Sequence, residues 1–230
     1  MYFKRKLLYI PIIHMSADLG TLSHEIDKKG IERVGKKLWE RHKEVISGFW
    51  NSVVTYLKSL DVKGFKIYQD GMIADGEVGM RIVKEGIKGG SKNYEIIAEL
   101  LKGGAILVKT EDFALVKMEH DKIKKLAQSK SIMDKFTAYL DYRVTKNSLL
   151  NERDKFIAMR IDRTLNHGET GILFLGAYHN IIAKLPKDIH IIQLKDQNKI
   201  KEYQRLFLHW KKDEKRFEEL ANYLTSCVSI

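Results

Sequence analysis

The sequence has two prolines, only one cysteine and no long apolar run, and the last two features each exclude a class of protein. Cys227 has no second cysteine to pair with, so an intramolecular disulfide is excluded and a reducing, cytoplasmic location is expected. No run approaches the roughly 20 apolar residues that a membrane-spanning helix needs. The basic and apolar segment 1–13 is followed by no small-residue cleavage site, which favours a core strand over a signal peptide.

Several binding motifs are also absent. The formal net charge of +11 would favour anionic partners, but the lysines are scattered beside glutamates along helix-like segments. Neither a zinc-finger spacing nor an RNP-like aromatic motif accompanies them, so nucleic acid is not the expected partner, although a nonspecific electrostatic role stays open. The glycines at 86, 89 and 90 lack the Gly-Lys-Ser/Thr sequence of a phosphate loop, and no HExxH helix is present.

Length and composition predict one globular α/β domain. The 230 residues are 44% hydrophobic and 31% charged, which is typical of a soluble chain with a single core. Apolar runs and, at 65–71, an alternating aromatic-rich segment predict five strands, at 7–13, 65–71, 105–108, 171–175 and 189–194. Helical periodicity predicts helices at 31–60, 78–87, 94–101, 113–127, 132–165 and 198–224. This alternation predicts a mostly parallel central sheet flanked by long helices in one domain, 1–230, with the helical region 113–165 as a candidate subdomain or lid.

Four details of this prediction depend on single residues or single segments. Pro11 favours an edge position or a strand end for the first strand, because proline cannot donate to a neighbouring strand. Gly48 is predicted to kink or interrupt the helix at 31–60. The segment 132–165 is either one long helix or two. The run 171–175 is apolar throughout, which predicts a strand buried on both faces of the sheet.

The most informative functional pattern is that four predicted strands end in a functional side chain. These side chains are His14, Asp70, Glu111 with Asp112, and His179. In open parallel sheets the carboxyl ends of the strands share one rim, where ligands bind, so these groups are expected to converge. At any single position, a polar residue that merely ends a strand is the simpler interpretation. The four positions together favour a site.

A second signal lies on the predicted helix at 132–165. Asp154 falls on an otherwise apolar face, together with Leu150, Ile157, Ile161 and Leu165. A carboxylate that points inward must be paired or hydrogen-bonded, because burying an unpaired charge is costly. Arg153 and Arg160 lie on the adjoining face and are candidate partners or anion clamps. A purely structural interpretation, in which Asp154 holds the helix against a loop, is about as plausible.

The histidines divide into two groups. His14 and His179 each follow an apolar strand, and with Asp70 and Glu111 they are candidate ligands of a divalent metal ion. Without a metal, a histidine and an acid could instead activate water as a general-base pair. The other six histidines have no such context and are treated as ordinary: His24, His42, His120, His167, His190 and His209.

Two short segments resemble the signatures of a known family. Gly176-Ala-Tyr-His179, at the end of a predicted strand, and Asn151-Glu-Arg-Asp154, on the preceding helix, are similar to the GxxH and E/N-R-D motifs of the TraB/Tiki proteins. These are distantly related to the erythromycin esterases and the ChaN-like haem-binding lipoproteins. The resemblance implies that His14, Glu111 and His179 line one cleft, with Arg153 and Asp154 as supports. At Pro11-Ile-Ile-His14, proline stands where the family usually has glycine, and members differ too much in activity to imply one reaction.

These patterns together predict a hydrolase of an ester or amide bond. His14 and His179 would ligate a divalent metal ion or position water, Glu111 would act as general base, and Arg153 with Arg160 would stabilise an oxyanion or bind a substrate carboxylate. The remaining candidates are a further ligand, Asp70, and the supporting residues Asp18, Asp112, Asp154 and Asn180. The expected substrate is a small molecule or peptide, either neutral or anionic.

The alternative is a protein without turnover that binds a metal, a cofactor or an anionic small molecule in the same cleft. If His14 and His179 share one metal ion, their side chains should lie within about 4 Å of each other.

Overall fold

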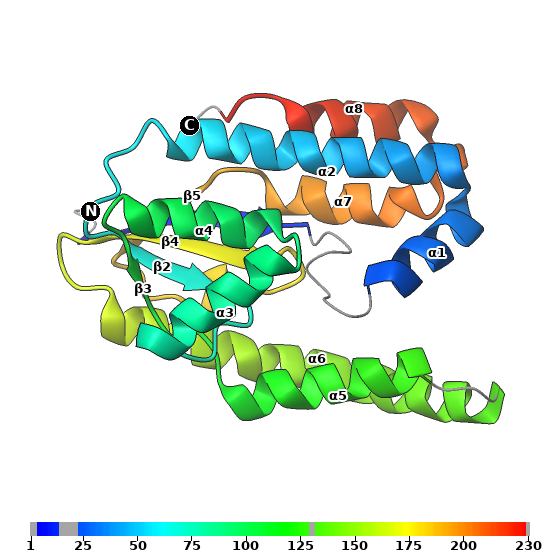
Figure 1. The fold of residues 1–230 in the computed structure, drawn as a ribbon, viewed down its shortest axis with the longest axis horizontal. Helices are drawn as coiled ribbons and strands as arrows, with labels where there is room; N and C mark the ends of the chain where they lie inside the picture. Colours follow the sequence, from blue (N-terminus) through cyan, green and yellow to red (C-terminus); the bar gives the residue numbers. More distant parts are fainter. Residues whose placement is uncertain (1–3, 14–22, 129–131, 229–230) are drawn as a thin grey trace.

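The computed structural model describes residues 4–13, 23–128 and 132–228 and shows an α/β fold with a five-stranded sheet (Figure 1). The strands are β1 (Arg5–Ile12), β2 (Lys66–Gln69), β3 (Ile106–Leu107), β4 (Thr170–Gly176) and β5 (Ile189–Gln193). They are ordered β3-β2-β4-β1-β5, and every pairing is parallel. The predicted fold class is therefore confirmed, with β2 and β3 shorter than expected.

Helices cover both faces of this sheet. The helices of the described residues are α1 (Ser23–Val34), α2 (Lys36–Leu57), α3 (Gly76–Lys88), α4 (Lys92–Lys102), α5 (Phe113–Gln128), α6 (Ile132–Thr164), α7 (Gln197–Phe207) and α8 (Glu214–Thr225). Short 3-10 turns lie at Ile182–Lys184 and Trp210–Lys212. Figure 1 shows α5 and α6 side by side below the sheet and extending past it, whereas α2, α4, α7 and α8 lie above it. Within the described part of the chain, no helix is long and apolar enough to cross a membrane.

The strand β4 explains how two cores form on one sheet. Ile172 and Phe174 point into the larger core, which also holds residues of α2, α4, α7 and α8. Leu173 and Leu175 point into the smaller core, with Ile157 and other residues of α6. Side chains alternate between the faces of a strand, so a run that is apolar at every position fits a strand covered on both sides. The prediction for 171–175 is confirmed.

Pro11 predicted either an edge position for β1 or a strand end at the proline, and the structure agrees only with the second. β1 lies inside the sheet, between β4 and β5, so an edge position is wrong. Pro11 nevertheless lies near the strand end, where β1 pairs with β4 at Leu175 and the pairing with β5 has stopped at Tyr9. The missing N–H therefore removes no hydrogen bond to β5.

The helical segment 31–60 is broken at a different glycine from the predicted one. α1 ends at Val34 and α2 begins at Lys36, because Gly35 adopts a φ of 85° that favours glycine. Gly48 lies inside α2 without interrupting it. A Cβ atom at Gly48 would lie 2.5 Å from Thr225 Cγ2. This glycine therefore allows α8 to approach closely.

The C-terminal helix is also divided, so the prediction of one helix at 198–224 is wrong. α7 stops at Phe207, and α8 begins after Asp213, whose side chain accepts a hydrogen bond from the backbone N–H of Arg216. Such a cap starts a new helix by satisfying one of its exposed N–H groups. The segment 132–165, by contrast, forms the single helix α6.

His42, on α2, lies in a largely buried aromatic environment. Its Nδ1 lies 2.9 Å from the Tyr203 hydroxyl oxygen, its ring stacks on Phe207, and burial lowers its pKa to about 4. The folded state therefore favours the neutral ring. We expect the free energy of unfolding to fall by roughly 3 kcal/mol as the pH is lowered from 6.5 toward 4.

The measurement is urea denaturation at several pH values, with His42→Gln compared with His209→Gln. His209 is exposed, so only the first variant should flatten the dependence in this pH range. A dependence that is equally steep in both variants would contradict this role of His42.

Candidate functional site

The carboxyl ends of β2 and β4 bring the first part of the site together. The backbone N–H of Asp70, directly after β2, donates to the carbonyl of Phe174 at 2.8 Å. Asp70 Oδ2 in turn accepts a hydrogen bond of 3.0 Å from the backbone N–H of Gly176, where β4 ends. The predicted convergence of strand ends is therefore present for Asp70 and the Gly176–His179 segment.

His179 and Asp154 form a buried pair, called the dyad below. His179 Nδ1 lies 2.5 Å from Asp154 Oδ1, and Asp154 Oδ2 accepts a hydrogen bond of 2.8 Å from the backbone N–H of Asn180. His179 is 4% and Asp154 is 2% exposed. Gln197 fixes the turn before the histidine, because its Nε2 donates to the carbonyls of Ala177 and His179. The ring therefore has one defined orientation.

The second ring nitrogen of His179 faces Asp70. Nε2 lies 3.8 Å from Asp70 Oδ2. Burial is the largest influence on the pKa of His179 and lowers it, but the hydrogen bond to Asp154 and the charge of Asp70 raise it, and the net pKa is above its ordinary value. Two carboxylates therefore favour the protonated imidazole, as expected for a histidine between negative charges.

Arg153 holds three carboxylates beside the dyad. Its Nε donates to Glu111 Oε2 at 2.8 Å, and Nη2 donates to Asp70 Oδ1 at 2.7 Å and to Glu111 Oε1. Nη1 donates to Glu119 Oε2. These four residues are called the acid–arginine cluster below. Burial alone would lower the pKa of Arg153, but the three carboxylates raise it above its usual value, so the guanidinium stays charged.

Glu111 is fixed on all sides. Its side chain is 0% exposed, both oxygens accept from Arg153, and Oε1 also accepts from the backbone N–H of Gly71 at 3.1 Å. Burial raises its pKa most, the charge of Asp70 adds to this, and Arg153 opposes it, with a net rise. This geometry suits a residue that positions others.

A polar network beneath Asp70 was not predicted from the sequence. Thr110 Oγ1 accepts a hydrogen bond from the backbone N–H of Gln69 at 3.0 Å, and Asn93 Nδ2 donates to Gln69 Oε1 at 2.9 Å. Gln69 Nε2 donates to the carbonyl of Asp70. Gln69 and Thr110 directly precede Asp70 and Glu111, so their polar character at strand ends was the available signal.

Tyr9 and Glu119 were also missed. The Tyr9 hydroxyl is buried and has no hydrogen-bond partner among the described residues. Its pKa is raised by burial first and then by the charges of Asp70 and Asp154. A phenol inside an otherwise apolar strand was a usable signal. Glu119 lies on α5, and nothing in the sequence distinguishes it from the other charged residues of that helix.

In the described ranges, the side chains of the other predicted site residues do not belong to the dyad or the acid–arginine cluster. Arg160 Nε donates to the carbonyl of Lys109 at 3.0 Å, which anchors the segment after β3, and Arg160 makes no described contact with the acid–arginine cluster. Asp112 caps α5, because its Oδ1 accepts from the backbone N–H groups of Ala114 and Leu115. Asn180 contributes its backbone N–H. His14 and Asp18 lie outside the described residues. The prediction that the side chains of His14 and His179 lie within about 4 Å of each other therefore stays a prediction.

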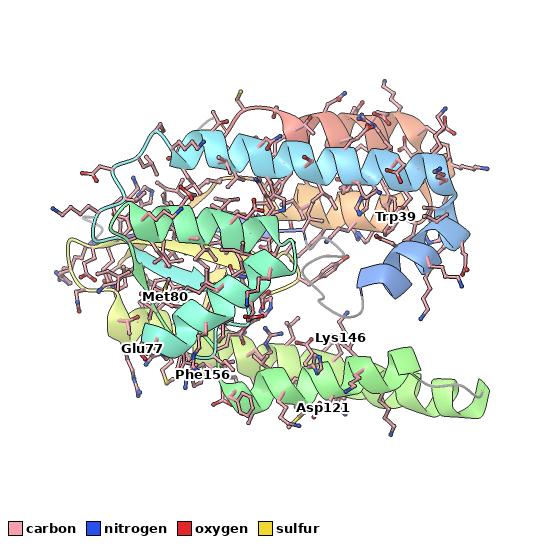
Figure 2. All side chains as sticks on the ribbon, in the orientation of Figure 1. Trp39, Glu77, Met80, Asp121, Lys146 and Phe156 are labelled. Atoms are coloured by element: carbon pink, nitrogen blue, oxygen red, sulfur yellow. The ribbon has the colours of Figure 1, made fainter. Side chains whose placement is uncertain are left out.

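The surface next to the dyad carries an exposed aromatic ring. Tyr178 is 49% exposed, and the ammonium group of Lys146 lies 5.7 Å from the centre of its ring. Lys146 projects from α6 (Figure 2). The residue before His179 is therefore accessible to solvent, whereas His179 itself is covered.

The described residues do not by themselves form a metal site. Asp70 Oδ2 and His179 Nε2 are 3.8 Å apart, a spacing that two ligands of one ion can have. However, no group of three histidine, cysteine, aspartate or glutamate side chains in the described ranges could hold a metal ion. Arg153 also engages Asp70 and Glu111, which are two of the predicted ligands.

Comparison with known proteins adds no relative, because no family, curated protein or solved structure matches this chain. The similarity to the TraB/Tiki signatures therefore stays a prediction. The geometry of the dyad and the acid–arginine cluster is the basis for a functional proposal.

Proposed function

We propose that the protein hydrolyses an ester or amide bond, with His179 transferring the proton and Asp154 orienting the imidazole. The observation that carries this proposal is the 2.5 Å contact between Nδ1 and Asp154 Oδ1. A carboxylate at Nδ1 holds the proton there, so the lone pair of the neutral ring is at Nε2, which is the arrangement of a histidine base in known triads.

The reaction needs one proton to move twice. Nε2 takes a proton from water as the water oxygen bonds to the acyl carbon, and a tetrahedral intermediate forms. Nε2–H then gives this proton to the leaving oxygen or nitrogen as its bond to carbon breaks. The carboxylate of Asp70, 3.8 Å from Nε2, stabilises the imidazolium between the two steps.

Arg153 and Glu111 act as positioning residues in this proposal. Nε, Nη1 and Nη2 of Arg153 each donate to a carboxylate already, which argues against the oxyanion role expected from the sequence. Both oxygens of Glu111 accept from Arg153, which argues against a general base there. Arg153 instead holds Asp70 in front of His179.

The local charge favours a neutral or cationic substrate. Four carboxylates, those of Asp70, Glu111, Glu119 and Asp154, surround one guanidinium and one imidazole. The site is therefore negative even with a protonated histidine, and an anionic substrate would be repelled.

The second candidate is a binding protein without turnover that uses the same residues for a cation. Burial favours it: the side chains of Glu111, Asp154 and His179 are 0%, 2% and 5% exposed. A small cation held by Asp70, His179 and water molecules would need less access than an ester or amide substrate, and water is required because the described side chains alone do not form a metal site.

One experiment separates the two functions. The protein is purified without added metal, its metal content is measured, and a panel of neutral and cationic esters and peptides is tested with the wild type, His179→Gln and the exposed control His209→Gln. We expect hydrolysis by the wild type and the control, and a loss of about 10²–10⁴-fold in His179→Gln. Bound metal with no hydrolysis would support the binding protein. Equal activity in all three would overturn a role for His179.

A further inference from the structure

A large groove lies between α2, α3 and α4, away from the dyad. Its volume is about 870 Å³, and none of its lining residues belongs to the dyad or the acid–arginine cluster. Pockets that bind small molecules usually have about 300–1,000 Å³ and mostly apolar walls. The size of this groove is therefore that of a ligand site.

The walls of the groove are apolar. Leu57 comes from α2, Val83 from α3, and Ile96 and Leu100 from α4. Met80, labelled on α3 in Figure 2, also lines it and is 37% exposed. A flexible thioether can adapt to an apolar ligand, so this wall suits a hydrocarbon chain.

Close packing fixes α3 against α4 near the groove. A Cβ atom at Gly86 would lie 2.1 Å from the Tyr94 ring, which shows how closely the two helices approach there. Val83 and Ile87 precede and follow this contact on α3 and line the groove. This contact therefore sets the spacing of α3 and α4 beside the groove.

The polar lining has a positive balance. Four lysines and two glutamates contribute to it: Lys58, Lys84, Lys92, Lys102, Glu95 and Glu99. Lys92 pairs with Glu95 at 2.8 Å and Lys102 with Glu99 at 2.6 Å. Lys84 makes no ion pair with any residue of the described ranges. Lys58 makes no ion pair there either, although its charge, after the hydrogen bond from Lys102, helps to lower the pKa of Glu99. Two ammonium groups are therefore available to a negatively charged ligand.

We propose that this groove binds a fatty-acid carboxylate. The hydrocarbon chain lies against the apolar side chains of α2, α3 and α4, and the carboxylate binds Lys58 or Lys84. Apolar walls with one or two charged groups at the margin match an amphipathic anion, because the chain gains from burial and the head group keeps a partner. This site does not depend on the proposed hydrolysis.

The test is calorimetric titration with dodecanoate below its micelle concentration. We expect saturable binding of one molecule by the wild type, about tenfold weaker binding by the double variant Lys58→Gln/Lys84→Gln, and unchanged binding by Lys187→Gln/Lys212→Gln. The control removes the same charge from exposed lysines elsewhere. Met80→Trp, which fills the groove from a partly exposed position, should also weaken binding.

Three outcomes would overturn the proposal. They are no saturable binding to the wild type, equal binding by wild type and both groove variants, and equal affinity for uncharged dodecanol. Binding to vesicles with anionic lipids, without binding of free dodecanoate, would assign the groove to a membrane surface instead. Because binding is measured directly, a failed hydrolase assay does not affect this result.

Discussion

Arg153→Met should lower the free energy of unfolding by about 3–5 kcal/mol at pH 7, the usual cost of removing one partner from a buried charge network. Arg153 is 6% exposed and contacts Asp70, Glu111 and Glu119. Methionine fills similar space but leaves three neighbouring carboxylates without their cation. Urea denaturation followed by circular dichroism measures the change.

Arg216→Met is the matched control. Arg216 also contacts carboxylates, those of Glu202 and Glu219, but its side chain is 38% exposed. We expect this variant to lose much less stability than Arg153→Met, because exposed ion pairs contribute little. Similar losses in both variants would contradict a special cost of burial at Arg153.

The loss in Arg153→Met should also shrink as the pH is lowered. Without the guanidinium, burial and mutual repulsion raise the pKa of the carboxylates in the folded state. A folded state with raised carboxyl pKa values binds more protons than the unfolded state, so its relative stability increases with falling pH. A loss that stays constant from pH 7 to pH 5 would argue against repulsion as its cause.

Asp154→Asn should reduce kcat/KM by about 10⁴-fold, the size of effect seen when the orienting carboxylate of a histidine triad is replaced by an amide. The amide oxygen can still accept from the backbone N–H of Asn180, which leaves the NH₂ group facing His179 Nδ1. That group donates to Nδ1 and forces the ring proton onto Nε2. The neutral ring then cannot take a proton from water at Nε2.

Two further measurements distinguish this role from a structural one. The pKa of His179, followed by NMR, should fall in Asp154→Asn because the ring loses its hydrogen-bonded carboxylate. The free energy of unfolding should change by only about 1 kcal/mol, since one hydrogen bond is exchanged for another. Asp162→Asn, a change at an exposed position of the same helix, is the control. Full activity in Asp154→Asn would exclude the dyad as the proton-transfer group.

The strand ends show how far sequence patterns predict a site. Asp70 and His179 were predicted because each lies at the end of a predicted strand, and parallel pairing brings them within 3.8 Å. Asp154 was predicted because it interrupts an apolar helical face, and it contacts His179. Periodicity identifies the side chains that point inward, but it does not identify what they meet there.

The errors have the same origin. Arg160 and Arg153 are equivalent in a helical pattern, but only Arg153 contacts the carboxylates, whereas Arg160 contacts the backbone of Lys109. Glu119 was missed because its contact depends on how α5 packs against α6. Gly48 was taken for a helix break because a sequence does not show that α8 approaches it.

The sequence by itself determined the layered α/β architecture, the buried strand β4 and the candidates Asp70, Asp154 and His179, because hydrophobic periodicity reports burial along one element at a time. The tertiary structure decided the strand order, the pairing of Asp154 with His179 and the assembly of three carboxylates around Arg153. It also decided the groove between α2, α3 and α4. These features join residues far apart in the chain, and their geometry is set by packing between elements.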